Sequence, residues 1–249
     1  MTAPIRLARG LTFAMAFLLR YISIWTNGSR MQINMTTFAA RRRHYLHQTL
    51  QSLFASDWAE TNASLNLIMG SSDHSHLGDY AHHPAIRIVP WDIASLPNLR
   101  SNCTLNKIRA LRWGDDDTLL ICEDDILFRP NWLAALKPAI EEMGTADYVL
   151  SLIAGKKVLE RSRFVKGKLW VKRYPTFTLT GAQALFYPSK AIRRRVADYL
   201  EQHMGRGCGD HLIGQYARSY AALYATKEML VKHAGGVSCF AMERREDFP

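Results

Sequence analysis

Residues 118–128 read TLLICEDDILF, with three adjacent carboxylates set between two apolar runs. The run before the acids is almost continuously apolar, which is typical of a parallel strand covered on both faces. In open α/β sheets, ligands bind beyond the carboxyl ends of the strands. Neighbouring carboxylates are costly to desolvate unless a cation or hydrogen-bond donors compensate them. The stretch therefore predicts a central strand that ends at a divalent-ion site, with a solvated acidic turn as the alternative.

The chain around this stretch alternates between strand and helix patterns. Leu46, Leu50 and Leu53 recur at helical spacing after a short apolar run. The expected strands cover residues 31–38, 65–69, 86–91 and 118–122, and the helix before the acids covers residues 102–113. This order predicts an α/β fold with a mostly parallel central sheet flanked by helices.

Composition limits the class of protein. With 249 residues, of which 48% are hydrophobic, the chain can bury the core of one α/β domain. The formal net charge of +10 favours anionic partners such as nucleotides, nucleic acid or an acidic membrane surface, without choosing among them. The four cysteines are widely spaced and form no CxxC pair, which predicts free thiols in a reducing compartment.

Residues 1–30 are expected to form a separate basic and apolar segment. They hold about fifteen mostly apolar residues interrupted by Arg20, fewer than the roughly twenty of a spanning helix. A helix on the membrane surface fits this pattern, and a leader or a non-native extension before Met31 is the alternative. We therefore expect a cytoplasmic protein, peripheral at the inner membrane face. A secretory-pathway lumen is the second alternative, because Asn-x-Ser/Thr triplets begin at Asn27, Asn34, Asn62 and Asn102.

Several stretches resemble one enzyme family. ICEDDILFRPNWLAAL resembles the acidic DXD-type motif of GT-A fold glycosyltransferases, in the EDD form of inverting N-acetylglucosaminyltransferases and their bacterial relatives. MTTFAARRRHYLHQTLQSL looks like the family's first strand, nucleotide-contacting loop and first helix. LNLIMGSSD looks like the second strand with its turn, and NCTLNKIRALRWGDDDTLLICEDD looks like the helix that leads into the acidic strand.

The resemblance implies a Rossmann-like GT-A domain over residues 31–249. Its mostly parallel sheet would carry the nucleotide-sugar half, residues 31–128, and residues 129–249 would form the acceptor-binding half. The implied activity is metal-dependent transfer of a sugar from a nucleoside diphosphate sugar, most simply a UDP-sugar, to an acceptor hydroxyl with inversion. The sugar would be a hexose or an N-acetylhexosamine, and the acceptor a glycan, a glycolipid or a protein glycan.

The resemblance also assigns residues on the donor side. Asp125 would coordinate Mn²⁺ or Mg²⁺, Asp124 would contact the donor sugar, and Glu123 would lie near the ribose. His233, followed by small residues and Ser238, resembles the family's late histidine and would be a second metal ligand. The other residues expected to bind the nucleotide sugar are Thr36, Thr37, Arg41, Asp73, Asn106, Arg109 and Lys232. For Arg41, a charged helical turn that faces water is the alternative.

The acceptor side rests on two further stretches. Gly181, Ala182 and Gln183, within TLTGAQALFY, resemble the small-residue strand that forms the acceptor floor, and a plain turn is the alternative. Asp210 precedes a helical pattern and resembles the catalytic base, with a helix N-cap as the alternative role. His211 is the neighbouring alternative base.

Two features stand apart from this assignment. The histidines at 74, 76, 82 and 83 are expected in an exposed loop rather than at a transition-metal site. The basic stretch at residues 163–174 is expected to be a solvated hairpin, with an acceptor loop, a membrane-facing hairpin or a nucleic-acid-binding strip as the alternatives. Two other functions stay open: a nucleotidyltransferase of related fold, and a non-enzymatic basic protein that binds nucleic acid or a membrane surface. With glycosyl transfer as the leading interpretation, no nucleic-acid partner is expected.

Overall fold

A computed structural model describes the chain over residues 31–37, 43–61, 63–91, 99–144, 147–153, 169–172 and 182–234. The chain divides into two compact units, Met1–Arg30 and Met31–Pro249. The expectations for residues 1–30, for Arg41, for Gly181 and for most of residues 163–174 fall outside the described part.

The centre of the second unit is an eight-stranded sheet in the order β3-β2-β1-β4-β8-β6-β9-β7. Strands β3, β2, β1 and β4 pair in parallel, β8 is antiparallel to both of its neighbours, β6 and β9 are parallel, and β7 is antiparallel to β9. A separate antiparallel pair joins β5 to β10. The strands are β1 (Gln32–Thr37), β2 (Ser64–Met69), β3 (Ile86–Val89), β4 (Leu119–Glu123), β5 (Ile126–Phe128), β6 (Tyr148–Ser151), β7 (Trp170–Lys172), β8 (Ala184–Tyr187), β9 (Ala222–Thr226) and β10 (Val231–His233). The expected mostly parallel α/β sheet is confirmed.

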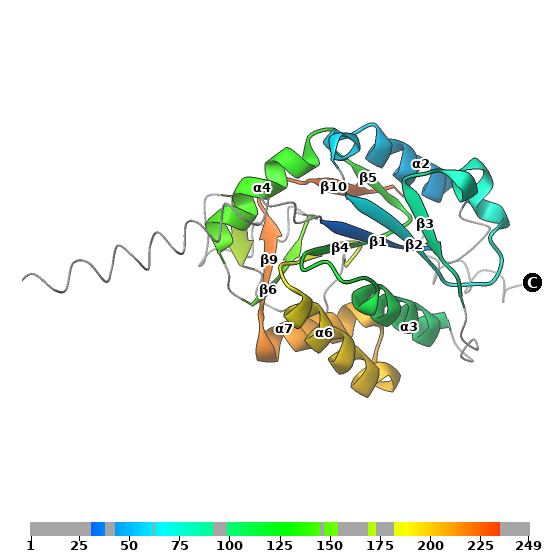
Figure 1. Ribbon diagram of the computed structural model, residues 1–249. Helices are drawn as coiled ribbons and strands as arrows, with labels where there is room; N and C mark the ends of the chain where they lie inside the picture. The colour runs from blue at the N-terminus through cyan, green and yellow to red at the C-terminus, as the bar shows by residue number, and fades with distance from the viewer. Residues whose placement is uncertain are drawn as a thin grey trace, which may run out of the picture. The chain divides into compact units, whose positions relative to one another are not determined.

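Helices cover both faces of this sheet. Figure 1 shows α3, α6 and α7 on one side, and α2 and α4 on the other. The long helices are α2 (Arg43–Phe54), α3 (Leu99–Arg112), α4 (Trp132–Met143), α6 (Lys190–His203) and α7 (Gly209–Tyr220). The 3₁₀ segments among the described residues are η2 (Asp57–Glu60), η3 (Ser75–His82) and η4 (Met204–Arg206). Each sheet face is therefore closed by amphipathic helices, as a buried central strand requires.

Strand β4 is the central strand that its apolar sequence predicts. It lies between β1 and β8, and the side chains of Leu119 through Cys122 are between 0% and 4% exposed. Leu119 and Ile121 belong to the same buried cluster as Leu212 and Ile213 of α7. The burial on both faces explains the continuous apolar run, because neither face of the strand meets water.

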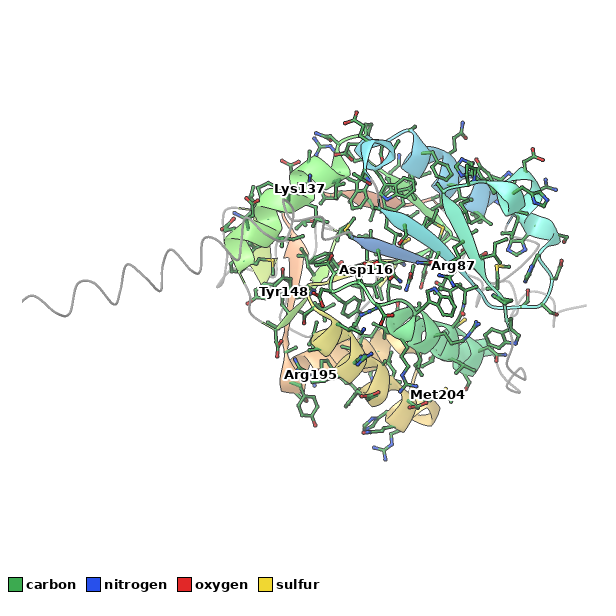
Figure 2. The ribbon with its side chains drawn as sticks, in the orientation of Figure 1. Arg87, Asp116, Lys137, Tyr148, Arg195 and Met204 are labelled. Carbon is green, nitrogen blue, oxygen red and sulfur yellow. The ribbon has the colours of Figure 1, made fainter. Side chains whose placement is uncertain are left out.

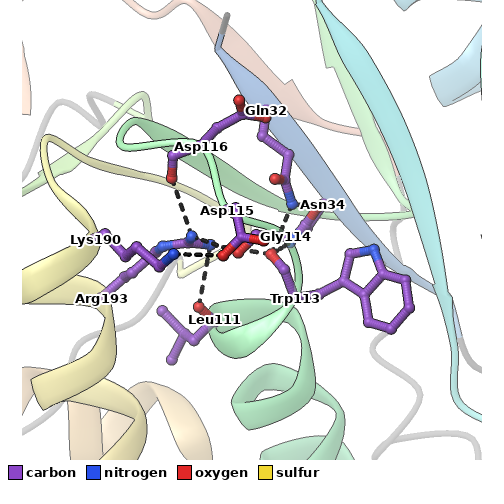
Figure 3. Close-up of polar contacts among 9 residues, drawn as sticks. All are labelled: Gln32, Asn34, Leu111, Trp113, Gly114, Asp115, Asp116, Lys190 and Arg193. Atoms are coloured by element: carbon purple, nitrogen blue, oxygen red, sulfur yellow. Dashed lines mark hydrogen bonds and ion pairs between the residues drawn. The ribbon is translucent and has the colours of Figure 1, made fainter.

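The turn between α3 and β4 is held in place by hydrogen bonds from one buried arginine of α6 (Figure 3). Arg193 of α6 is only 1% exposed. Its guanidinium donates hydrogen bonds to four backbone carbonyl oxygens, those of Leu111, Trp113, Gly114 and Asp116. Gly114 has φ +83°, where a Cβ would lie 1.9 Å from the side-chain oxygen of Gln32. This turn needs glycine, and it sets where β4 begins.

Other basic side chains lie on the outside of both helical layers. Figure 2 shows Lys137 on α4 and Arg195 on α6 at opposite outer surfaces, while Tyr148 lies inside. Of the described helices, none combines the length and the apolar character that a membrane crossing demands. Asn34, one of the four triplet asparagines, is fully buried and donates to the Ala110 carbonyl (2.6 Å), so its amide could not carry a glycan in this fold.

Candidate active site

The acidic stretch ends β4 beside the carboxyl end of β1. The two strands are parallel, with Thr36 aligned with Glu123. Parallel alignment brings Thr37, the last residue of β1, to the same edge of the sheet as the three acids. The expected position of the acids at the carboxyl end of a central strand is confirmed. After Asp125 the chain enters β5, so Glu123, Asp124 and Asp125 form a tight turn between two strands rather than a solvated loop. These three residues are called the acidic corner below.

Asp125 meets His233, which lies 108 residues later in the chain. The antiparallel pairing of β5 with β10 aligns His233 with Ile126 and so carries the imidazole to the acidic corner. His233 Nε2 lies 2.9 Å from Asp125 Oδ2, with the Asp125 side chain 4% exposed and that of His233 36% exposed. The backbone amide of Ala234 also donates to the Asp125 carbonyl (2.6 Å). The pair predicted to hold a metal is therefore adjacent, with the imidazole open on one side.

Asp124 points into the protein. It is 1% exposed, and its Oδ2 accepts a hydrogen bond from the Thr37 hydroxyl at 2.7 Å. Thr37 Oγ1 also lies 3.1 Å from His76 Nε2. Because the single hydroxyl proton of Thr37 goes to the carboxylate, His76 Nε2 must be the donor in the second bond. The hydroxyl of Thr49 in α2 lies within hydrogen-bond distance of the backbone carbonyls of Asp124 (2.9 Å) and Ile126 (2.7 Å) and shares its one proton between them, which fixes the corner further.

The expectation of an exposed histidine loop is wrong for His76. Its side chain is 2% exposed and bound to Thr37, whereas His82 is exposed and His74 and His83 are half-buried. Burial lowers the pKa of His76, and the nearby Asp73 partly offsets this shift. The sequence pattern does not reveal this one buried position, because η3 is a short 3₁₀ segment interrupted by the non-helical Gly78.

Glu123 faces a third set of partners. Lys107 of α3 lies with Nζ 3.0 Å from Glu123 Oε1 and also forms an ion pair with Asp210 Oδ1 at the start of α7. Lys107 is 7% exposed at its side chain, while Glu123 and Asp210 are 26% and 28% exposed. Lys107 is a site residue that the sequence interpretation missed. The sequence pattern gives little indication that Lys107 is buried at the site, because a lysine within a helix usually faces water.

The charges of this triad influence one another. Burial on its own lowers the pKa of Lys107, but the carboxylates of Asp210 and Glu123 outweigh it and raise that pKa above its usual value. Burial raises the pKa of Glu123, and the Lys107 ammonium partly offsets the rise. Buried ionised groups persist only when they are paired, so each of these side chains depends on the others.

Asp210 does not cap its helix. The N-cap of α7 is Cys208, and Asp210 lies in the first turn with its carboxylate on Lys107. The alternative of a capping role is therefore wrong. His211 Nε2 accepts a hydrogen bond from Gln215 Nε2 at 2.7 Å, which occupies the lone pair that a base would need. Of the two expected bases, Asp210 is the one beside the acidic corner.

Other expected donor-side residues support the same edge through backbone contacts. Asn106 Nδ2 donates to the Ile68 carbonyl (3.1 Å), and Arg109 donates to the carbonyls of Met69 (2.7 Å) and Pro90. These bonds hold α3 to the carboxyl ends of β2 and β3. Both side chains are therefore engaged with the protein.

The remaining expected residues differ in how exposed their side chains are and in which groups they bind. Thr36 is 1% exposed and its hydroxyl donates to the Cys122 carbonyl (3.4 Å). Asp73 is exposed and accepts from the Ser75 amide (2.8 Å). Ala182 is 2% exposed, and the Gln183 carbonyl accepts from the Glu123 amide (2.8 Å). Lys232 is exposed on β10 next to His233.

The donor set at Asp125 and His233 fits a divalent ion. Two ligand atoms about 2.1 Å from one octahedral ion lie about 3 Å apart, close to the 2.9 Å between Asp125 Oδ2 and His233 Nε2. In the described part of the chain, no three His, Cys, Asp or Glu side chains gather as a complete metal site. Such an ion would therefore take its other ligands from water or from a bound diphosphate.

Comparisons with known proteins bear on the fold. No known family and no curated protein matches the chain. The crystal structure of TarS from S. aureus aligns with a TM-score of 0.50 and 12% identity, covering 80% of this chain and 37% of that chain. The glycosyltransferase GlyE of Streptococcus pneumoniae TIGR4 aligns at 0.47 with 14% identity, covering 79% and 45%. The galactosyltransferase LgtC, solved with donor and acceptor sugar analogs, aligns at 0.46 with 13% identity, covering 75% and 69%.

The likeness to TarS defines a class of fold. Of the three alignments, the one with TarS is close enough to support the assignment, and the chain spans about a third of that longer protein. The chain has the GT-A type of glycosyltransferase fold, as the sequence resemblance implied. At this low identity the likeness extends to the fold alone, so the chemistry has to be inferred from the residues at the acidic corner.

Proposed function

We propose that this protein transfers a sugar from a nucleoside diphosphate sugar, with UDP as the nucleotide, to an acceptor hydroxyl with inversion. One observation carries the proposal: the three consecutive acids at the end of β4 meet His233, Thr37 and Lys107 from distant segments, and Lys107 also binds Asp210. A solvated acidic turn would need no such partners. In a GT-A fold this edge of the sheet is where a nucleotide sugar would be held.

Asp125 and His233 would hold Mn²⁺ or Mg²⁺ together with the donor diphosphate. When bound, the ion supplies a Lewis acid that neutralises charge on the departing diphosphate. Lys232, exposed beside His233, would add a second positive charge for the same oxygens. Glu123, Asp73 and Arg109, whose side chains reach solvent, would line the ribose and nucleotide side. Thr36, Asn106 and Asp124 are at most 1% exposed and would support this side from within the protein.

Asp210 would take the proton from the acceptor hydroxyl as that oxygen attacks the anomeric carbon. Its side chain is 28% exposed, which leaves room for an acceptor to approach. A base on the face opposite the leaving diphosphate produces inversion. Gln183, whose carbonyl is bonded to the Glu123 amide, and Ala182 beside it would form the floor beneath the acceptor. The acceptor would be a glycan, a glycolipid or a protein glycan, and the donor sugar a hexose or an N-acetylhexosamine.

The test begins with thermal unfolding in UDP-, GDP-, dTDP- and CMP-sugars, each with and without Mn²⁺. A ligand that binds the folded state raises its melting temperature, so a rise with UDP-sugar that requires Mn²⁺ is expected. Asp125→Asn should abolish the rise, while Asp198→Asn, an exposed acid on α6, should keep it. Product anomers observed by NMR would then establish inversion.

Three outcomes would overturn the proposal. If UDP-sugar and Mn²⁺ leave the melting temperature unchanged and no sugar is transferred to any acceptor, the donor assignment is wrong. If the protein instead binds nucleic acid or anionic vesicles with strong salt dependence, and EDTA and Asp125→Asn have no effect, the acids are structural and the basic surface carries the function. Release of pyrophosphate from a nucleoside triphosphate would indicate the nucleotidyltransferase alternative.

A further inference from the structure

Lys107 joins three elements that are far apart in the sequence. It lies within α3, and its ammonium meets Glu123 at the end of β4 and Asp210 in the first turn of α7. Glu123 belongs to the half of the chain that carries the proposed donor site, and Asp210 belongs to the half proposed to bind the acceptor. The lysine is therefore the contact through which these two carboxylates are held together.

The position is built for a charged lysine. Only 7% of the Lys107 side chain is exposed, so water contributes little to its solvation. An ammonium has three N–H donors, and two of them are used by Glu123 Oε1 and Asp210 Oδ1. Without the ammonium, two part-buried carboxylates would remain close to one another without compensation. Mutual repulsion would then drive Asp210 away from Glu123.

Gly209 allows α7 to approach the lysine. A Cβ at this position would lie 3.0 Å from Lys107 Cδ, which is tighter than most Cβ contacts, and 3.7 Å from the Thr104 Cα, which is an ordinary contact. Glycine therefore lets the first turn of α7 pack against the stem of Lys107, and the next residue, Asp210, reaches the ammonium. The backbone at Gly209 and the charge on Lys107 together determine where Asp210 lies.

We propose that Lys107 is a positioning residue that fixes the base Asp210 at a set distance from the donor-side acid Glu123. This inference rests on the proposed function, since it assumes that Asp210 is the base. Lys107 binds Oδ1 of Asp210, and Oδ2 is the oxygen that takes the acceptor proton. Displacement of a catalytic group by about 1 Å can cost on the order of 10²-fold in rate, so an anchor of this kind governs turnover rather than donor binding.

The experiment measures kcat and the donor KM for sugar transfer from the UDP-sugar. It also measures, by calorimetry, the affinity for UDP with Mn²⁺. Lys107→Met is expected to lower kcat on the order of 10²-fold, with donor KM and UDP affinity changed by less than about threefold. Lys107→Arg keeps the charge and should recover part of the rate. Lys190→Met, which removes a different ion-paired lysine at the start of α6, is the matched control and should keep the wild-type kcat.

A folding failure of Lys107→Met would not leave the inference untested. Lys107→Met/Glu123→Gln removes one of the two facing carboxylates and is compared with Glu123→Gln alone. The double variant should have a much lower kcat than Glu123→Gln, at a similar donor KM, because Asp210 still lacks its anchor. Equal kcat values for these two variants would overturn the inference.

The remaining outcomes separate this inference from the proposed function. If Asp210→Asn is inactive while Lys107→Met keeps a kcat within about threefold of wild type, Lys107 is not a positioning residue and the proposed function stands. A fall in the calorimetric binding stoichiometry that accounts for the whole loss of kcat would mean a structural role alone, and would also overturn the inference. If Asp210→Asn stays fully active, the assignment of the base is wrong, and with it the premise of the inference.

Discussion

Replacing Arg193 with methionine tests how the turn before the acidic strand is held. Arg193 Nη2 donates to the carbonyls of Gly114 (2.7 Å) and Asp116 (3.0 Å), and Nη1 donates to that of Trp113 (3.0 Å) and, more weakly, Leu111 (3.4 Å). Burial lowers the pKa of Arg193, because removing the charged guanidinium from water costs free energy. This cost offsets part of the stabilisation that the hydrogen bonds provide. Methionine fills the space of the arginine stem but leaves the carbonyls without their donor.

The magnitude follows from the three shorter bonds. Each contributes about 1 kcal/mol net, so Arg193→Met should lower the free energy of unfolding by about 3 kcal/mol. For a domain of this size, that corresponds to a fall of roughly 6–12 °C in melting temperature. Since α3 carries Lys107, the variant should lose active molecules on warming while the folded fraction keeps its donor KM.

Urea unfolding followed by tryptophan fluorescence measures the loss. Arg194→Met is the matched control, because Arg194 is the next residue on the same helix and is exposed. Its effect should stay within about 0.5 kcal/mol of wild type. If Arg193→Met and Arg194→Met unfold at the same urea concentration with the same slope, the guanidinium does not hold this turn and the reasoning is refuted.

Three further predictions concern Thr37 and His76 at the carboxyl edge of the sheet and Gly114 in the turn before β4. Thr37→Val removes the hydroxyl that binds Asp124 and should destabilise the fold by about 1–3 kcal/mol, while Thr37→Ser should stay near wild type in urea unfolding. The pKa of His76 is lowered in the folded protein, so below about pH 6.5 the unfolded chain takes up the proton first. The stability linked to His76 is therefore complete above that pH and is lost as pH falls below it. In His76→Gln, the urea concentration at the unfolding midpoint should fall less steeply than in wild type as the pH is lowered. An equally steep fall would contradict this. Gly114→Ala places a methyl group 1.9 Å from the Gln32 side-chain oxygen at φ +83°, so we expect a loss of more than about 1 kcal/mol, and wild-type stability would contradict it.

Local patterns in the sequence were sufficient for the strands and helices that lead to the site. The continuous apolar run before the acids predicted a buried strand, and the structure has β4 at Leu119–Glu123. The helix expected over residues 102–113 is α3, Leu99–Arg112, which begins three residues earlier. Such features are predictable because hydrophobic periodicity depends on neighbours a few residues away.

The partners of the acids could not be read from local patterns. His233 reaches Asp125 only because β10 pairs with β5, and Lys107 is buried where the first turn of α7, with Gly209, packs against α3. Likewise, the insertion of β8 as an antiparallel strand beside β4 has no counterpart in the spacing of residues along the chain.

The sequence by itself determined that an apolar strand ends in three carboxylates within an alternating α/β chain. The tertiary structure decided which charge faces which: Asp125 meets a histidine, Asp124 a buried hydroxyl, and Glu123 a lysine shared with Asp210. The physical reason is that the free energy of a buried charge depends on groups brought close by the chain's long-range packing, and sequence spacing does not encode those distances.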